Sequence, residues 1–280
     1  MNGKLTLRID TAAAIFFVTG MITASPILLP LLLQPAHAFT RDWIPMYSDL
    51  VYAPVAASGD NVYVTWWTNK TTGKWDAFLA ISTDNGKTFG DVIKLTNSTG
   101  RSFDTRIDAS GDNVYVTWLN NKTGVNQIYF KASNDGGKTF SDEVMVNSKL
   151  PGKGQVAKPT PRIGHGTPVI SSGDNVYMTW FEDVSGRGNK SEVFFKASND
   201  DGKTFGNIIN LSKSPNSRSD DPAIAAEDDN VYVTFWDDKT GPRKPFFVAS
   251  NDGGQSFSNP IMLNATTTTT TTASAKTDAG

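Results

Sequence analysis

The residues of this chain that could carry out chemistry are restricted by what the sequence lacks. It contains no cysteine and only two histidines, His37 and His165, in 280 residues. Thiol nucleophiles, disulfides and cysteine-ligated zinc are therefore excluded. The 26 basic residues are balanced by 28 acidic ones, which argues against nucleic acid as a partner. Carboxylates, hydroxyls, arginines and aromatic rings remain, and we predict no metal site and no cofactor.

Arginines recur at one place relative to a repeated segment. Arg101, Arg162 and Arg218 lie 12, 13 and 12 residues before the asparagine that successive repeats share, and Arg106 follows soon after the first of them. The planar guanidinium group binds a carboxylate through two parallel hydrogen bonds. We therefore predict that these four arginines are ligand-binding residues, and that three repeats direct Arg101, Arg162 and Arg218 at one axial pocket. The alternative is that they are solvated loop arginines paired with neighbouring carboxylates such as Asp104 or Asp220.

Two sequence blocks recur four times in the same order. The first block reads SGDNVYVTWW in its first copy and occupies residues 58–67, 110–119, 172–181 and 227–236. The second block reads STDNGKTF in its first copy and occupies residues 82–89, 133–140, 198–205 and 250–257. Recurrence at this spacing indicates a repeat architecture built from units of about 50 residues.

Each repeat is predicted to hold four strands. A short inner strand precedes a Gly-Asp-Asn turn, and the strand after that turn is apolar on both faces, with Val62, Val64 and Trp66 on one and Tyr63, Thr65 and Trp67 on the other. A third strand leads into the second block, whose Asp-Gly chemistry forms a hairpin into a fourth strand. Strands that are apolar on both faces must be covered on both. The sequence therefore predicts an all-β fold, a β-propeller of four-stranded antiparallel blades.

The second block resembles the Asp-box, SxDxGxTF/W, of the sialidase-like (BNR repeat) β-propellers. This resemblance covers residues 50–264 and implies a structural hairpin in each blade. The aspartate would accept hydrogen bonds from nearby backbone N–H groups, and the phenylalanine would wedge between sheets. The implied structural residues are Ser82, Asp84, Gly86, Phe89, Ser133, Asp135, Gly137, Phe140, Ser198, Asp200, Gly202, Phe205, Ser250, Asp252, Gly254 and Phe257.

The resemblance also implies where a site would lie. Sialidases hold the carboxylate of their sugar with three arginines from different blades and use an aspartate as acid/base. In this chain the candidates for that aspartate are Asp104, Asp183 and Asp237, which we expect in the loops at the end of the blades opposite the Asp-boxes. No tyrosine nucleophile with a carboxylate partner can be assigned.

Two functions of different classes remain open. The first is a non-catalytic binding module for a surface glycan or protein, and the second is an exo-α-sialidase-type glycoside hydrolase acting on acidic sugars. The catalytic sialidase domain has six blades, whereas four Asp-boxes occur here. We therefore favour binding over catalysis, since the fold hosts both.

The two ends of the chain differ in composition from the repeats. Residues 1–38 combine Lys4 and Arg8, an apolar stretch and an Ala36-His37-Ala38 cleavage pattern, which indicates an export signal or, if it is retained, a membrane anchor. Residues 39–264 form the predicted propeller. Residues 265–280 are threonine-rich and are predicted to be disordered. The protein is thus expected to be extracellular or at the cell surface.

Overall fold

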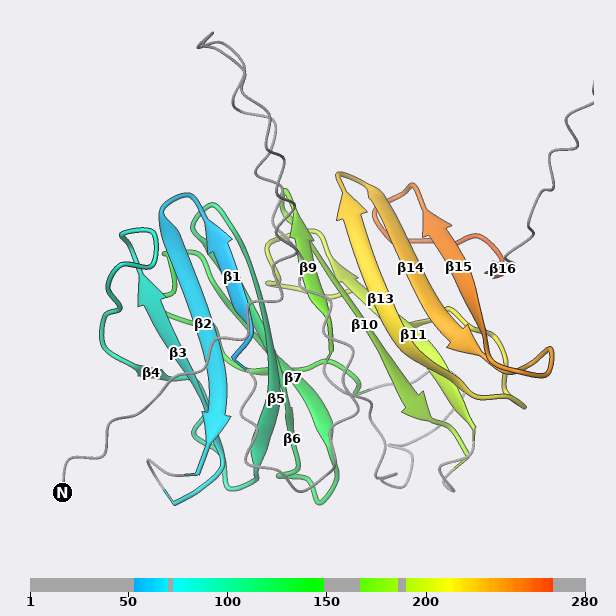
Figure 1. Cartoon of the computed structure of the whole chain (residues 1–280), viewed down its shortest axis with the longest axis horizontal. Helices are drawn as coiled ribbons and strands as arrows, with labels where there is room; N and C mark the ends of the chain where they lie inside the picture. Colours follow the sequence, from blue (N-terminus) through cyan, green and yellow to red (C-terminus); the bar gives the residue numbers. More distant parts are fainter. Residues whose placement is uncertain (1–52, 70–72, 149–166, 186–189, 264–280) are drawn as a thin grey trace, which may run out of the picture. The chain divides into compact units, whose positions relative to one another are not determined.

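The computed structural model describes residues 53–69, 73–148, 167–185 and 190–263. The predicted signal segment and the threonine-rich tail lie outside these residues, as does Arg162. The described residues contain sixteen strands in four four-stranded sheets, and the strands follow the chain order across each sheet (Figure 1). The prediction of antiparallel four-stranded blades is confirmed. No helix among the described residues is long and apolar enough to cross a membrane.

The four sheets, here called blades 1 to 4, have closely similar strand lengths. Blade 1 consists of β1 (Val55–Ser58), β2 (Asn61–Thr68), β3 (Asp76–Ser82) and β4 (Ile93–Lys94). Blade 2 consists of β5 (Ser102–Ser110), β6 (Asn113–Asn120), β7 (Gln127–Ser133) and β8 (Val144–Met145). Blade 3 consists of β9 (Val169–Ser172), β10 (Asn175–Asp183), β11 (Ser191–Ser198) and β12 (Ile209–Asn210). Blade 4 consists of β13 (Ser219–Glu227), β14 (Asn230–Asp237), β15 (Lys244–Ser250) and β16 (Ile261–Met262).

The chain divides into two compact units. Unit 1, residues 1–124 and 128–144, contains blades 1 and 2, and unit 2, residues 125–127 and 145–280, contains blades 3 and 4. The boundary between them falls within β8. Each unit therefore offers one complete example of how a blade packs on the next.

In unit 1 the Tyr63 face of blade 1 packs against blade 2. Tyr63 is fully buried, and the Oγ1 atoms of Thr65 and Thr105 lie 2.5 Å apart in a hydrogen bond between the two blades. A Cβ atom on Gly137 of blade 2 would lie 2.7 Å from Ile81, which pairs with Tyr63 across blade 1. Glycine at this position thus lets the Asp-box hairpin of blade 2 approach the sheet of blade 1 closely.

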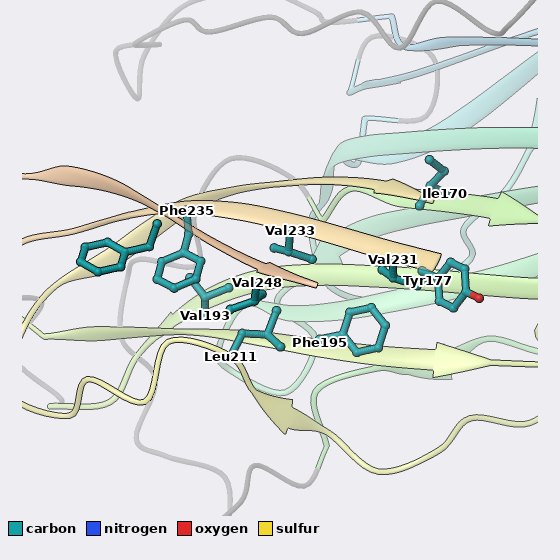
Figure 2. Packing of buried hydrophobic residues seen from close by; sticks show 10 residues of the cluster. Ile170, Tyr177, Val193, Phe195, Leu211, Val231, Val233, Phe235 and Val248 are labelled. Carbon is teal, nitrogen blue, oxygen red and sulfur yellow. The ribbon is translucent and has the colours of Figure 1, made fainter. Parts of the chain in front are cut away.

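Unit 2 repeats this packing between blades 3 and 4. A buried cluster joins the Tyr177 face of blade 3 to the Val231 face of blade 4 (Figure 2). The Tyr177 hydroxyl donates to the Asp228 carbonyl over 3.2 Å, and Phe257 of the blade 4 Asp-box meets Phe195 edge-on with ring centroids 4.7 Å apart. Each unit therefore has the same polarity, in which the tyrosine face of one blade receives the valine face and the Asp-box of the next.

The Asp-box hairpins share one hydrogen-bond pattern. In blade 2 the Asp135 carboxylate accepts the Thr139 N–H over 2.9 Å and the Thr139 hydroxyl over 2.6 Å, and Ser133 Oγ accepts the Gly137 N–H over 2.9 Å. These side-chain acceptors satisfy backbone N–H groups that a tight turn leaves without strand partners. The same bonds recur around Asp84, Asp200 and Asp252. The Asp-box therefore acts as a turn-closing device.

One expectation about the Asp-box does not hold throughout. Phe257 packs between two sheets, but Phe89 of blade 1 is 46% exposed. The reason is positional, because the Phe89 hairpin sits on the valine side of blade 1, where unit 1 contains no further blade. Gly86 accordingly has room around it, since a Cβ atom there would meet only Val62, at 3.9 Å.

The packing of the central strands predicts a graded response to tryptophan truncation. Trp118 of β6 is 1% exposed, whereas Trp66, at the same position of β2, is only partly buried. Trp118→Ala should lower the free energy of unfolding by about 3–5 kcal/mol through lost burial and the cavity left behind. Trp66→Ala should cost clearly less. Chemical denaturation of the two variants measures this difference, and equal losses would contradict the assignment of buried and open faces.

The Asp-box predicts a particular acid response. The hydroxyl and N–H of Thr139, followed by the Ser133 hydroxyl, lower the pKa of Asp135 from 3.8 to about 2. A lowered folded-state pKa stabilises the fold above pH 4, and this contribution is lost as the pH falls towards 2. The melting-temperature gap between wild type and Asp135→Asn should therefore be largest at neutral pH and should close between pH 4 and 2. A gap that is independent of pH would contradict this role of the carboxylate.

Candidate functional site

The candidate acidic residues lie at the end of the blades opposite the Asp-boxes, but in strands and not in loops. The sequence placed Asp104, Asp183 and Asp237 in loops, and this placement is wrong. Asp104 lies inside β5, and Asp183 and Asp237 are the last residues of β10 and β14. At the end of β14, Asp237 is held by Ser219 of the neighbouring strand β13, which extends the pairing to the last residue of the strand.

Asp237 is committed to bonds inside blade 4. It is fully buried, and its carboxylate accepts the Ser219 hydroxyl over 2.9 Å and the Lys239 N–H over 2.6 Å. Asp183 is 2% exposed and accepts both the N–H and the hydroxyl of Ser185, each over 2.7 Å. A carboxyl group that donates a proton to a glycosidic oxygen must reach the substrate. The burial of Asp237 and Asp183 and these bonds fit a structural role.

Asp104 occupies a β-bulge of β5 and pairs with Arg106. The β5–β6 register shifts between Phe103 and Arg106, and Asp104 has a left-handed backbone conformation with φ of 56°. This conformation re-aims its side chain, and Asp104 Oδ1 lies 2.9 Å from Nη1 of Arg106. The Arg106 charge that was predicted to bind a ligand is therefore balanced within the strand.

Blade 4 has a bulge at the equivalent place, with two arginines around one carboxylate. Asp221 has φ of 50°, and the neighbouring Asp220 is 1% exposed. Asp220 forms ion pairs with Arg218, over 2.6 Å, and with Arg243. Arg243 also reaches Asp221 over 3.3 Å and lies over the Trp236 ring. The guanidinium groups hold a carboxylate of the protein itself, as a substrate-binding cluster would hold one from a sugar.

Arg101 has a different environment from the other predicted ligand-binding arginines. Its backbone N–H donates to Asn121 Oδ1 over 2.8 Å, and its guanidinium carbon lies 5.2 Å from the centre of the Trp75 ring. Arg101 and Arg106 belong to unit 1 and Arg218 to unit 2, while Arg162 lies outside the described residues. The convergence of these arginines on one pocket therefore stays a prediction.

Sequence reasoning named Asp220 as an alternative partner of the loop arginines but missed Arg243. Arg243 was missed because it follows the central strand of its repeat and not the inner one. The available signal was the Asp-Asp-Pro run that ends at Pro222, since proline interrupts strand pairing and is found at bulges. That signal locates the bulge but does not reveal which cation reaches it.

A polar groove lies at the same end of unit 2. It measures about 380 Å³ and is lined by Lys213, Ser214, Pro215, Asn216, Ser217, Asp238 and Lys239. Two turns form its walls, since the Ser217 N–H donates to the Ser214 carbonyl and the Gly241 N–H to the Asp238 carbonyl. Asp238 Oδ1 accepts the Arg218 N–H over 2.8 Å and so ties the walls together.

The groove combines two ammonium groups and the Asp238 carboxylate with neutral polar groups. Lys213 and Lys239 supply positive charge, and serine hydroxyls and the Asn216 amide supply donors and acceptors. Lys190 Nζ lies 3.2 Å from Asn216 Oδ1 and adds a third ammonium group beside the groove. Among the described residues, no cluster of three histidine, aspartate or glutamate side chains is placed to hold a metal ion.

Comparison with solved structures identifies the fold. The chain is similar to an α-L-arabinofuranosidase of Fusarium graminearum in complex with an iminosugar inhibitor (TM-score 0.53, 16% identity, 78% of this chain and 67% of that one). It is also similar to the NanB sialidase of Streptococcus pneumoniae (TM-score 0.52, 11% identity, 78% and 52%). A third similar structure is a sialidase of Trypanosoma rangeli (TM-score 0.51, 13% identity, 75% and 37%).

These similarities confirm the sialidase-like β-propeller fold. Identities of 11–16% show the fold alone. The chain spans about two thirds of the arabinofuranosidase and about half or less of the two sialidases. No protein-family model and no curated protein sequence matches the chain.

The Asp220 cluster gives a prediction about stability. Arg218→Gln combined with Arg243→Gln leaves the buried Asp220 carboxylate without its counter-charges, and the free energy of unfolding should fall by about 3–5 kcal/mol. Arg101→Gln, which leaves no buried charge behind, should cost less. Thermal or chemical denaturation measures both. If the double variant were as stable as wild type, the cluster would not be structural and its arginines would again be candidates for substrate binding.

Proposed function

We propose that this protein is an exported sialidase-like β-propeller that binds an acidic surface glycan without hydrolysing it, through the groove lined by Lys213 and Lys239. The observation that carries the proposal is the pairing of charges at this end of the blades. Asp237 is buried and hydrogen-bonded, Asp104 pairs with Arg106, and Asp220 pairs with two arginines. These carboxylates and arginines are bonded to groups of the protein itself, which favours binding over catalysis.

The groove supports binding because it combines charge with hydrogen-bonding groups on fixed turns. Lysine attracts a carboxylate or sulfate as a compact point charge, and hydroxyl and amide groups match the hydroxyls of a sugar. Its volume of about 380 Å³ falls within the usual range of ligand sites. Lys239 Nζ also lies 4.2 Å from the centre of the Phe246 ring, which limits the movement of its side chain.

The second candidate function is a glycoside hydrolase, which the fold comparison favours. The similar structures include an arabinofuranosidase and sialidases, which are hydrolases of neutral and of acidic sugars. This is an analogy of fold, and a fold of this kind hosts both binding and catalysis. The experiment must therefore measure affinity and product release together.

Isothermal titration calorimetry with sialyllactose and with arabinobiose tests the proposal. We expect binding of the acidic sugar, and Lys213→Glu combined with Lys239→Glu should weaken it at least about tenfold, equivalent to about 1.4 kcal/mol. The control is Lys138→Glu combined with Lys203→Glu, which makes the same charge change on the Asp-box hairpins and should leave affinity unchanged.

Two results would overturn the proposal. Release of free sialic acid or arabinose, detected by chromatography, would establish the hydrolase instead. Equal loss of affinity in both double variants would show that overall charge, and not the groove, attracts the sugar.

A further inference from the structure

One face of blade 4 is apolar and partly exposed in the part of the chain that the structure describes. Tyr232 is 41% and Ile261 56% exposed, and the Tyr232 ring stacks on Phe247 with centroids 6.2 Å apart. The equivalent residues of blade 3, Tyr177 and Phe195, are fully buried because blade 4 covers them. We define the Tyr232 face as Tyr232, Phe247, Ala249 and Ile261. It corresponds to the tyrosine face of blade 3, but no following blade packs on it among the described residues of unit 2.

Blade 1 exposes the opposite kind of surface. Phe89 of its Asp-box is 46% and Val55 57% exposed, while the valine face of β2 is only partly buried. In blade 4 the equivalent phenylalanine, Phe257, packs on Phe195, and a Cβ atom on Gly254 would lie 2.5 Å from the same ring. The blade 1 hairpin has the shape that fits a tyrosine face but meets none within unit 1.

The two uncovered surfaces carry the same residues as the contact seen inside unit 2. Phe247 and Ala249 of blade 4 repeat Phe195 and Ala197 of blade 3, which Gly254 approaches. Gly86 and Phe89 of blade 1 repeat Gly254 and Phe257. Ile261 likewise takes the place of Ile209, which packs against the buried cluster of unit 2. A contact between these surfaces would therefore reproduce an interface that the chain already builds.

We propose that the Tyr232 face of blade 4 docks the Asp-box hairpin and valine face of blade 1 from a second copy of this chain. The contact is head-to-tail, because a tyrosine face receives a valine face and cannot receive another tyrosine face in the same way. Since each copy brings four blades and propellers contain four to eight, two copies are the most that one ring can hold. Apolar faces of this kind are covered in stable folds, which supplies the driving force.

Light scattering coupled to size-exclusion chromatography of the full chain tests this inference. Wild type should elute at twice the mass of one chain at high concentration. Tyr232→Lys and Phe89→Lys should each reduce it to the mass of one chain, because either substitution places a charge in the contact. Asp142→Lys, which adds a lysine at an exposed position of blade 2, should leave the mass unchanged. Both test positions are already exposed, and circular dichroism confirms that each variant folds.

Mixing the two defective variants distinguishes head-to-tail pairing from other kinds of association. The Tyr232→Lys chain keeps an intact blade 1 and the Phe89→Lys chain an intact blade 4, so a mixture should again form pairs, one chain of each variant. A wild-type chain that remains at the mass of one copy at every concentration overturns the proposal. Association that survives both substitutions, as through the N-terminal segment, overturns it as well, and so does a mixture that forms no pairs.

Discussion

The rest of the structure depends on one constraint, which is that the central strand of every blade is apolar on both faces. Tyr63 and Thr65 point to one side of β2 and Val62 and Val64 to the other, and the same alternation recurs in β6, β10 and β14. Such a sheet cannot leave either face in water without a cost in free energy. Within each unit, the next blade buries the tyrosine face of the blade before it. The Asp-box glycines permit the close approach between the two sheets.

This constraint also decides what the polar residues at the other end of the blades do. Strands that are buried on both faces carry their last polar side chains into a desolvated region, where each needs a partner. Asp237 accepts a hydrogen bond from the Ser219 hydroxyl, and the Asn120 amide donates one to Ser102 Oγ. Asp220 forms ion pairs with two arginines. Polar side chains that are available to a ligand are therefore expected in the turns beyond the strand ends, where the Lys213–Lys239 groove lies.

Much of the fold could be predicted from the sequence, because the same strand and turn pattern occurs four times at a regular spacing. Three copies of Asn-Val-Tyr-Val-Thr and a fourth with Met178 in place of the second valine predicted the central strands, and turn chemistry predicted the Asp-box hairpins. The β-bulge at Asp104 could not be predicted, since it depends on the register between two strands, whereas Pro222 marks the bulge at Asp221. The ion pair between Asp220 and Arg243 could not be predicted either, because Arg243 lies far along the sequence, in the segment before β15.

The site was the least predictable part for the same physical reason. Sequence spacing shows which residues recur, but not whether an opposite charge lies within 3 Å of them, and that proximity decides whether an arginine holds a ligand or a neighbour. Arg218 recurs as expected and Arg106 follows the recurring Arg101, and these two pair with Asp220 and Asp104, as the alternative of paired loop arginines predicts. The groove involves Lys213 and Lys239, which stand in unrelated positions of their repeats.

Within each unit, the central interaction is the packing of the second blade's Asp-box on the tyrosine face of the blade before it. A double-mutant cycle between Phe195 and Phe257, with each replaced by leucine and then both, tests this most directly, because their rings meet edge-on at 4.7 Å. The account predicts that the two losses in unfolding free energy are coupled by about 0.5–1.5 kcal/mol. Losses that simply add would show that the rings do not touch, and would contradict the packing on which this description of the blades rests.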